Sequence, residues 1–316
     1  IGEVVYDILP DSRKLGGGPT DFLHYAGMFG ANVSLVSAIG ADDLGREVIS
    51  ELNKFKITPV VAVTPYPTGR VLIFKNADVF TAHILENAAW DYIPYTTEAE
   101  NCIKKADAIY FGTLALRRAY SYNTILDLID EASNAEYRFF DINLRQNYYS
   151  KDLILELLKR ANILKINTEE LKVLRNLLGL RGSIDDICLN LKNKYNLKYF
   201  ILNDGAKESK IWGIDNLETN VKNSRVQQHF AYGAGNAFGG AFLGAIMAGK
   251  SQQEAHEIAN DVAVKICKQL KSNLKMILFY VVIGIVINFL SLYSVTYYQK
   301  ILDDFQFGRL CGFPLV

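Results

Sequence analysis

An excess of charge of either sign is absent from this chain, because 34 Lys and Arg residues are matched by 34 Asp and Glu residues. Affinity for nucleic acid comes largely from basic side chains that neutralise phosphates, so the composition predicts no nucleic acid or acidic polymer as partner. Half of the 316 residues are hydrophobic. A chain of this length can bury a large core, in one α/β domain or in two smaller domains.

Cysteine and histidine are scarce, with four of each in the whole chain. Their spacings match no disulfide framework, zinc site or His-containing catalytic triad. We therefore expect reduced thiols, as in a reducing compartment, and structural or solvated imidazoles. The chain has no secretory signal pattern and begins at Ile1 inside a predicted strand. We expect a cytoplasmic protein whose natural N-terminus lies further upstream.

One long apolar run stands out, at residues 276–293, where 18 residues carry no charge. This length predicts a transmembrane helix, with a buried core helix as the alternative. By the positive-inside rule, the basic residues before the run would keep the N-terminal part of the chain on the cytoplasmic side. These residues are Lys265, Lys268, Lys271 and Lys275.

Downstream of residue 96 the sequence alternates regularly between helical and strand patterns. Repeated strand–helix units predict a doubly wound, mainly parallel α/β sheet, whose ligands bind beyond the carboxyl ends of the strands. The stretch from Pro59 to Ile93 is instead rich in Val, Ile, Phe and Thr, which indicates strands and hairpins that form a small lid. The predicted helices lie at 97–105, 120–133, 151–160, 168–178 and 183–195, and the strands at 107–112, 137–142, 162–166 and 198–202.

Two glycine-rich turns precede predicted helices. Gly16-Gly17-Gly18 leads into a helix from about Thr20, which is its predicted N-cap, and Gly233-Ala234-Gly235 leads into another. Glycine allows backbone conformations that a Cβ would forbid. The unpaired amides at a helix start attract an anion, and the helix dipole strengthens the attraction. The second turn is therefore a candidate phosphate site, although glycine turns of this kind also serve plain packing.

Several segments resemble, in number, order and spacing, the ribokinase-like (PfkB) carbohydrate kinases, and among these the bacterial fructokinases. The likeness covers about residues 1–270, so we assign 1–271 to a kinase domain and 272–316 to an apolar tail. The segments are KLGGGPTDF at 14–22, SAIGADDLG at 37–45, AWDYIP at 89–94, FDINLR at 140–145, NTEE at 167–170 and FAYGAGNAF at 230–238.

The resemblance implies phosphoryl transfer from ATP, with Mg²⁺, to a sugar hydroxyl, and favours conversion of fructose to fructose 6-phosphate. It also implies a lid, formed mostly by residues 8–18 and 59–94, that covers the sugar and excludes water. In relatives the lid also carries dimer contacts, so a homodimer through the lid is a further expectation.

The resemblance assigns a role to each matched position. The positions that it implies for sugar contact are Asp7, Gly17, Gly18 and Asp21, and those for the anion hole are Gly233, Ala234 and Gly235. It places Arg145 near the phosphates and Gly205 in a nucleotide-binding turn. It links Asn167 and Glu170 to magnesium, Glu170 indirectly. Plain alternatives remain for three of them. Asp7 could cap a strand end, Arg145 could be a surface cation, and Glu170 could be an ordinary residue of a first helical turn.

Four departures from the family pattern bear on activity. The family's catalytic Asp is Asn236 here, and a carboxamide cannot accept the proton of a sugar hydroxyl. Asp21 replaces an Asn, Glu208 places a negative charge near the nucleotide turn, and Phe230-Ala231 replaces the motif's opening Asp-Thr. Loss of a positioned base typically costs about 10²–10⁴ in rate. We therefore expect a sugar kinase whose activity is weak or lost.

Two other interpretations stay open. The chain could be a non-catalytic, membrane-tethered module that binds a sugar or regulates another protein. It could also be a decayed fusion product, since its tail loosely resembles a membrane helix of bacterial ABC-type exporters and nothing in the kinases. The sequence does not decide among them, and it does not fix the sugar.

Overall fold

The structure is a computed structural model that describes residues 1–9, 12–76, 79–205, 207–222 and 233–268. The chain divides into two compact units, Ile1–Cys267 and Lys268–Val316. The predicted apolar run at 276–293 lies outside the described residues, as do Phe230 and Ala231. Within the described ranges, no helix is long and apolar enough to cross a membrane.

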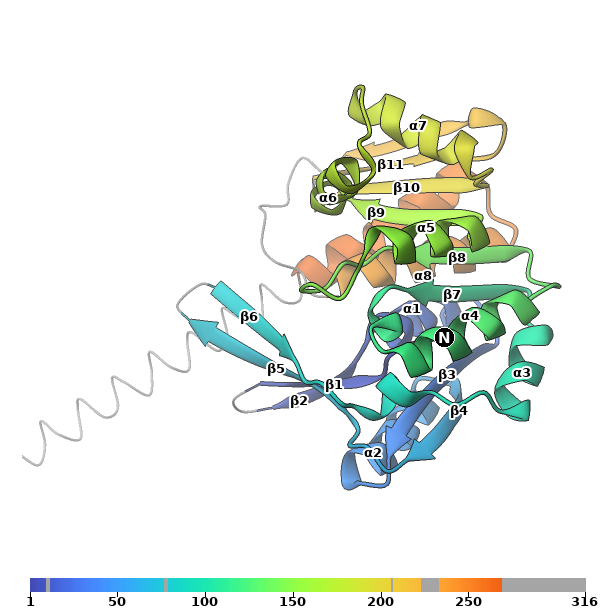
Figure 1. Ribbon diagram of the computed structural model, residues 1–316. Helices are drawn as coiled ribbons and strands as arrows, with labels where there is room; N and C mark the ends of the chain where they lie inside the picture. Colours follow the sequence, from blue (N-terminus) through green and yellow to red (C-terminus); the bar gives the residue numbers. More distant parts are fainter. Residues whose placement is uncertain (10–11, 77–78, 206, 223–232, 269–316) are drawn as a thin grey trace, which may run out of the picture. The chain divides into compact units, whose positions relative to one another are not determined.

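A six-stranded sheet forms the centre of the first unit, in the order β12-β11-β10-β9-β8-β7 (Figure 1). Its strands are β7 (Ala108–Gly112), β8 (Tyr137–Asp141), β9 (Ile163–Asn167), β10 (Tyr199–Asp204), β11 (Glu208–Trp212) and β12 (Glu218–Lys222). The four strands from β7 to β10 are parallel, and β11 and β12 are antiparallel additions at one edge. The predicted α/β fold with a mainly parallel sheet is confirmed, whereas β11 and β12 were not predicted.

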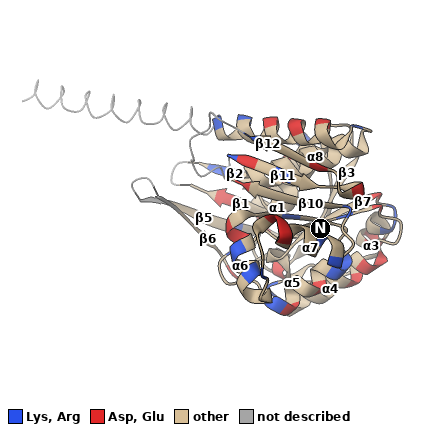
Figure 2. Cartoon of the chain, turned by 90° about the horizontal axis from the view of Figure 1, so that it is seen from above, with Lys and Arg blue, Asp and Glu red and all other residues tan. Residues whose placement is uncertain are grey.

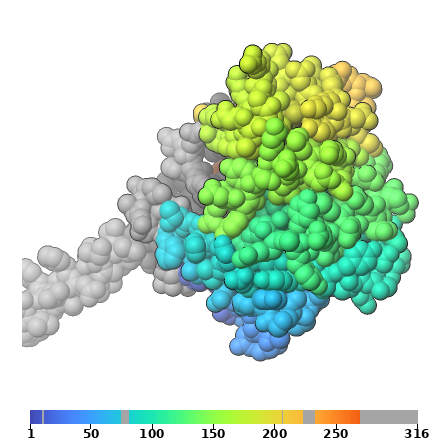
Figure 3. Space-filling view, viewed as in Figure 1, coloured from blue at the N-terminus to red at the C-terminus, as the bar shows by residue number. Residues whose placement is uncertain are grey.

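Helices cover both faces of this sheet (Figure 1). Figure 3 shows one face, on which residues coloured green to yellow cover the sheet. One face carries α4 (Ala119–Glu131), α5 (Lys151–Arg160), α6 (Thr168–Leu178) and α7 (Ile184–Lys194), and α3 (Thr97–Lys104) packs against α4. The other face carries α1 (Gly18–Gly27) and α8 (Ala234–Met247). Lys, Arg, Asp and Glu residues are interspersed along the outer helices, and many form exposed ion pairs such as Lys172–Glu169 (Figure 2). Short 3-10 helices lie at Ala89–Tyr92, Leu114–Leu116 and Ile214–Asn216.

The predicted lid region forms a four-stranded sheet in the order β2-β1-β5-β6. It contains β1 (Val5–Ile8), β2 (Arg13–Gly16), β5 (Gly69–Asn76) and β6 (Val79–Ile84). The strand β4 (Ile57–Thr64) overlaps the predicted lid range, but it pairs in parallel with β3 (Val33–Gly40). The helix α2 (Asp43–Lys54) connects these two strands, as parallel pairing requires a crossover.

Asp42 ties the start of α2 to the start of the lid strand β5. Its carboxylate accepts hydrogen bonds from the Gly45 amide at 2.8 Å, the Thr68 hydroxyl at 2.5 Å and the Thr68 amide at 2.9 Å. Burial acts to raise the pKa of Asp42, but the three hydrogen bonds outweigh burial and lower it. The carboxylate therefore fixes the point at which the lid leaves the main body.

Close packing of α1 against α8 depends on glycines. A Cβ on Gly240 would overlap the carbonyl oxygen of Phe22, and a Cβ on Gly244 would lie 2.9 Å from the carbonyl oxygen of Ala26. The backbones of the two helices can approach only because these side chains are missing. The prediction of Thr20 as N-cap is wrong, since Gly17 is the N-cap and Pro19 lies in the first turn, where its fixed φ suits a helix.

A buried histidine joins the helical segment 252–268 to the antiparallel edge of the sheet. His256 is fully buried, with Ser209 Oγ 2.8 Å from its Nε2 and Thr219 Oγ1 2.8 Å from its Nδ1. Burial lowers the pKa of His256 to about 4. Because an unfolded histidine titrates near 6.5, the unfolded state takes up a proton between these two values that the folded state does not.

This arrangement predicts that His256 destabilises the fold as the pH falls from about 6.5 toward 4. The contribution of neutral His256 to the free energy of unfolding is fully present above pH 6.5, and about 2 kcal/mol of it is lost by pH 5. Urea unfolding at pH 7 and pH 5 measures the loss, and His256→Asn should reduce the difference between the two values. The control is His83→Asn on the exposed side of β6, which should leave the pH dependence unchanged. An unaltered pH dependence in His256→Asn would contradict the prediction.

Candidate functional site

Polar residues gather where the parallel strands end. Asp141 closes β8, Asn167 closes β9 and Asp204 closes β10. The registers pair Asp141 with Lys165 and Asn203 with Asn167, so these ends form one continuous edge. Ligands of open α/β sheets bind beyond this edge. The predicted residues Arg145, Asn167, Glu170 and Gly205 all lie in the segments that leave it.

A buried ion pair lies at the centre of this edge. Lys165 Nζ donates to both carboxylate oxygens of Asp141, at 3.0 and 2.9 Å, and the side chains are 8% and 0% exposed. A Cβ placed on Gly235 would lie 3.3 Å from the same Nζ. The glycine therefore leaves space directly beside a buried cation. Sequence reasoning missed Lys165, although a lysine within the buried strand ILKIN is a detectable signal.

The glycine turn before α8 has the conformation that an anion site needs. Gly233 is the N-cap of α8, with φ of 85° in the left-handed region, and Ala234 and Gly235 form the first turn. The first amide groups of a helix have no intrahelical partner, and their N–H bonds point outward from its N-terminal end. They place positive character at the edge of the sheet, beside Lys165, whose charge is paired with Asp141. The chain can thus accommodate a phosphate there, and the anion-hole role of the turn remains a prediction.

Asn167 and Glu170 form a capping box at the start of α6. The side-chain oxygen of Asn167 accepts the Glu170 amide at 2.8 Å, and Glu170 Oε2 accepts the Asn167 amide at 3.0 Å. Glu170 Oε1 also accepts the Leu144 amide at 3.0 Å, which ties the loop after β8 to α6. Burial raises the pKa of Glu170, against a lowering effect of Lys165.

These hydrogen bonds limit how Asn167 and Glu170 could bind a metal ion. Both carboxylate oxygens of Glu170 already accept a backbone amide, and each keeps one further lone pair. Across the described ranges, no group of three or more His, Cys, Asp or Glu side chains could hold a metal ion. The residues therefore fit Mg²⁺ only as an ion bound mainly by phosphates and water, which is the usual arrangement in phosphoryl transfer.

Arg145 lies in the loop between β8 and α5. The loop bends sharply, since Asn143 and Gln146 both have positive φ, at 38° and 47°. Arg145 donates to the carbonyl of Leu144 at 3.3 Å and acts electrostatically on Glu170 and on Glu3. It is a half-buried cation among buried carboxyl groups. The loop therefore brings Arg145 to the same region as the capping box.

The first glycine turn is held by Glu3, a residue that sequence reasoning did not single out. The Gly18 amide donates to Glu3 Oε1 at 3.0 Å, and a Cβ on Gly17 would lie 2.7 Å from the Glu3 carbonyl oxygen. Gly17 has φ of 106°, which favours glycine. A Cβ on Gly18 would lie 2.9 Å from the Tyr110 hydroxyl oxygen. Any side chain at these positions would displace Glu3 or Tyr110.

Two carboxyl groups face the region between the lid and the helices. Asp7 is buried on β1, opposite Lys14 on β2, and a Cβ on Gly16 would lie 2.6 Å from its Oδ2. Asp21 lies in the first turn of α1, and the Asn236 side chain on α8 is near enough to lower its pKa. A Cβ on Gly233 would lie 2.9 Å from Asp21 Oδ2. The structure therefore brings the predicted sugar positions together with the predicted catalytic turn.

Gly205 lies in the exposed turn between β10 and β11, with φ of 55° and no atom within 4 Å of the position of a Cβ. The Thr168 hydroxyl donates to Asp204 at 3.0 Å, so this turn is tied to the start of α6. In the register of the β10–β11 hairpin, Glu208 lies opposite Asp204. The turn is thus next to the capping box, as a nucleotide-binding role requires, and that role remains a prediction.

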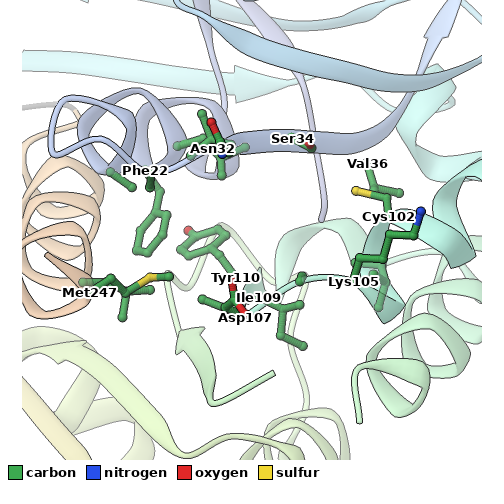
Figure 4. Close-up of a pocket in the computed structure, with 18 of the residues that line it drawn as sticks. Phe22, Asn32, Ser34, Val36, Cys102, Lys105, Asp107, Ile109, Tyr110 and Met247 are labelled. Atoms are coloured by element: carbon green, nitrogen blue, oxygen red, sulfur yellow. The ribbon is translucent and has the colours of Figure 1, made fainter. Parts of the chain in front are cut away.

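A cavity of about 860 Å³ lies apart from these residues (Figure 4). It separates β3 from β7 and is lined in part by Asn32, Ser34, Cys102, Lys105 and Met247. At one end Phe22 and Tyr110 lie ring to ring, with centroids 4.3 Å apart. None of the predicted site residues is among the described residues that line it.

Comparison with known proteins identifies what the chain is similar to. The family model described as "pfkB family carbohydrate kinase" matches residues 11–276. The uncharacterized sugar kinase of Pyrococcus horikoshii is 25% identical over 195 residues, 56% of this chain and 63% of its own length. The ATP-dependent 6-phosphofructokinase of Thermoanaerobacterium thermosaccharolyticum is 23% identical over 188 residues, 54% of this chain and 58% of its own length. The aligned part thus spans less than two thirds of either relative.

Solved structures show the same fold. The Pyrococcus horikoshii protein in complex with ATP has a TM-score of 0.71 at 23% identity, covering 83% of this chain and 89% of its own. The fructokinase of Vibrio cholerae O395 in apo form has a TM-score of 0.72 at 19% identity, covering 85% and 97%. A double mutant of that fructokinase is known with fructose, ADP and potassium bound, and it has a TM-score of 0.68 at 20% identity, covering 83% and 87%.

The Lys165–Asp141 pair predicts a large cost when only one partner is removed. Lys165→Met leaves a buried carboxylate without a cation, which should lower the free energy of unfolding by about 3–5 kcal/mol. The double variant Lys165→Met/Asp141→Leu removes both charges and should recover most of that loss, as urea unfolding measures. The control Lys172→Met breaks an ion pair with Glu169 whose side chains are 68% and 78% exposed, and should cost less than about 1 kcal/mol. A double variant as unstable as the single variant would contradict the prediction.

Proposed function

The chain belongs to the pfkB family of carbohydrate kinases, and from this we propose that it transfers the γ-phosphoryl group of ATP to a hydroxyl group of a sugar. The observation that carries the proposal is the start of α8, where the helix begins at Gly233 and the absence of a side chain on Gly235 leaves space beside Lys165. Phosphoryl transfer needs preorganised positive character around the transferred group, and little covalent chemistry from the protein.

The nucleotide is proposed to bind along the carboxyl edge of the sheet. The amides of Ala234 and Gly235 would stabilise the charge on the transferred phosphoryl group, and Arg145 would lie near the phosphates. Gly205 would allow close passage of the nucleotide at the β10–β11 turn. Mg²⁺, when bound with ATP, would neutralise phosphate charge, and Asn167 and Glu170 would hold its water shell. ATP is bound in the Pyrococcus horikoshii structure of the same fold, which supports ATP as the nucleotide.

The sugar is proposed to bind between the lid sheet and α1, against Asp7, Gly17, Gly18 and Asp21. Fructose is favoured, with fructose 6-phosphate as product, because the matched segments are fructokinase-like and a fructokinase shares the fold. Asp7 and Glu3 both raise the pKa of Asp21, so several acidic groups are close together here. An unphosphorylated sugar fits them better than a sugar phosphate, whose negative charge they would repel.

We propose that turnover is slow compared with metabolic kinases. Asn236 lies in the first turn of α8, where the family resemblance places the catalytic Asp, and its carboxamide cannot accept a proton. The same observation favours a second candidate function, a sugar-binding module without catalysis. The two differ in one measurable respect, which is the release of ADP when the sugar is present.

A coupled assay of ADP release with Mg-ATP and fructose tests the proposal. The expected result is fructose-dependent turnover below about 1 s⁻¹, since typical kinases reach about 1–100 s⁻¹, and little or no turnover with fructose 6-phosphate. Turnover within the typical range would contradict the lowered rate. Calorimetric binding of fructose without turnover would favour the binding module. Absence of binding and of turnover with fructose and with other sugars would overturn the kinase proposal.

A further inference from the structure

Compared with the family pattern, the acid and the amide have exchanged places between α1 and α8: Asp21 stands on α1 and Asn236 on α8. The family resemblance implies an Asn in the first turn of α1 and an Asp in the first turn of α8, and this chain has Asp21 and Asn236 in those places. The Asn236 side chain is near enough to Asp21 to lower the pKa of its carboxyl group. The site has therefore kept one carboxyl group and one carboxamide, with the carboxyl group on the other helix.

The carboxyl group of Asp21 is close to the turn where the phosphoryl group is proposed to bind. Its Oδ2 would be 2.9 Å from a Cβ on Gly233, the N-cap of α8. The glycines that let α1 and α8 approach fix this proximity, because a side chain at Gly240 would push Phe22, and with it Asp21, away from α8. A general base must lie within hydrogen-bond reach of the proton that it accepts, or one water away.

Neighbouring carboxyl groups are less suitable because their oxygens are engaged. Asp141 is held by Lys165 through both oxygens. Glu170 accepts two backbone amides and Glu3 accepts the Gly18 amide. Asp7 lies on the lid strand β1, opposite Lys14. Asp21 is the carboxyl group in this set that contacts the residue at the family's catalytic position.

From this geometry we infer that Asp21 is the general base of the reaction, in place of the residue at 236. The inference rests on the proposed kinase function. In the step, the sugar oxygen forms a bond to the γ-phosphorus while its proton moves to the Asp21 carboxylate. The bond from the γ-phosphorus to the β–γ bridging oxygen of ATP breaks, and the electron pair stays on ADP. Asp21 then returns the proton to solvent.

The electrostatic surroundings of Asp21 suit this role. Desolvation raises the pKa of Asp21 to about 7; Lys14 and the hydrogen bond from Asn236 lower it, while Asp7 and Glu3 raise it. A base is most effective when its pKa lies near the working pH, because it is then both available and strong enough to take the proton. A carboxylate with an ordinary pKa near 4 would be a weaker base.

The experiment compares the full chain with three variants, by ADP release and by stability. Asp21→Asn should lower kcat by about 10²–10⁴. Asp21→Asn/Asn236→Asp returns a carboxyl group to α8 and should recover at least about tenfold of that loss. Asp127→Asn, an exposed helical residue of α4, serves as the matched control and should change neither rate nor stability.

A pH profile of the unaltered protein adds a measurement that does not depend on the folding of a variant. Since Asp21 acts when deprotonated, kcat/KM should fall about tenfold per pH unit below about 7 and level off above it. A flat profile between pH 5 and 8 would overturn the inference. So would an Asp21→Asn variant that folds and keeps its kcat while KM rises, because that result assigns Asp21 to sugar binding alone.

Failure of the inference can be separated from failure of the proposed function. An active protein that is insensitive to Asp21→Asn refutes the base and leaves the kinase standing. If Asn236→Asp alone converts an inactive protein into an active one, the base was missing and Asp21 did not supply it. If neither the protein nor any variant releases ADP with any sugar, the kinase function is overturned, and the inference with it.

Discussion

The close approach of α1 to α8 is the constraint on which the candidate site depends. Gly240 faces the Phe22 carbonyl and Gly244 faces Ala26, and in neither place is there room for a side chain without separating the helices. This packing aligns the first turns of both helices. The first turn of α1 carries Asp21 and that of α8 carries Asn236, so the contact between acid and amide follows directly from the absence of two side chains. The rings of Phe22, Tyr110 and Phe139 then fix α1 against the sheet.

Burial of Asp141, Glu170 and Glu3 in the site is tolerated because each of them has a specific partner. Asp141 has Lys165, Glu170 has two backbone amides, and Glu3 has the Gly18 amide. Burying a charge without such partners would cost several kcal/mol. The partners also hold the loops together, because Glu170 links the loop after β8 to α6 and Glu3 links the start of the chain to the first glycine turn. These polar groups thus determine the conformation of the site as well as its charge.

The lid leaves the main body at a point fixed by Asp42 and Thr68. These residues link the end of β3 and the start of α2 to the start of β5. In the proposed kinase function, this attachment would hold the small sheet in one orientation over the sugar, and closure would exclude water that hydrolyses ATP. Burial of Trp90, with Arg117 4.1 Å above its ring and paired to Asp91, strengthens the same region.

The regular alternation of helix and strand after residue 96 was sufficient to predict the α/β class, because the 3.6-residue and two-residue periods are local properties. The glycine turns could be located for the same reason. The antiparallel strands β11 and β12 were missed, since short strands at a sheet edge carry little periodic signal. Lys165 was missed because its partner Asp141 lies 24 residues away in the sequence and adjacent in the sheet. The family resemblance also predicts that Asn236, a carboxamide, stands at the catalytic position. Only the packing of α1 on α8 revealed that Asp21 lies against it, because a contact between residues over 200 positions apart is decided by tertiary structure and leaves no local pattern.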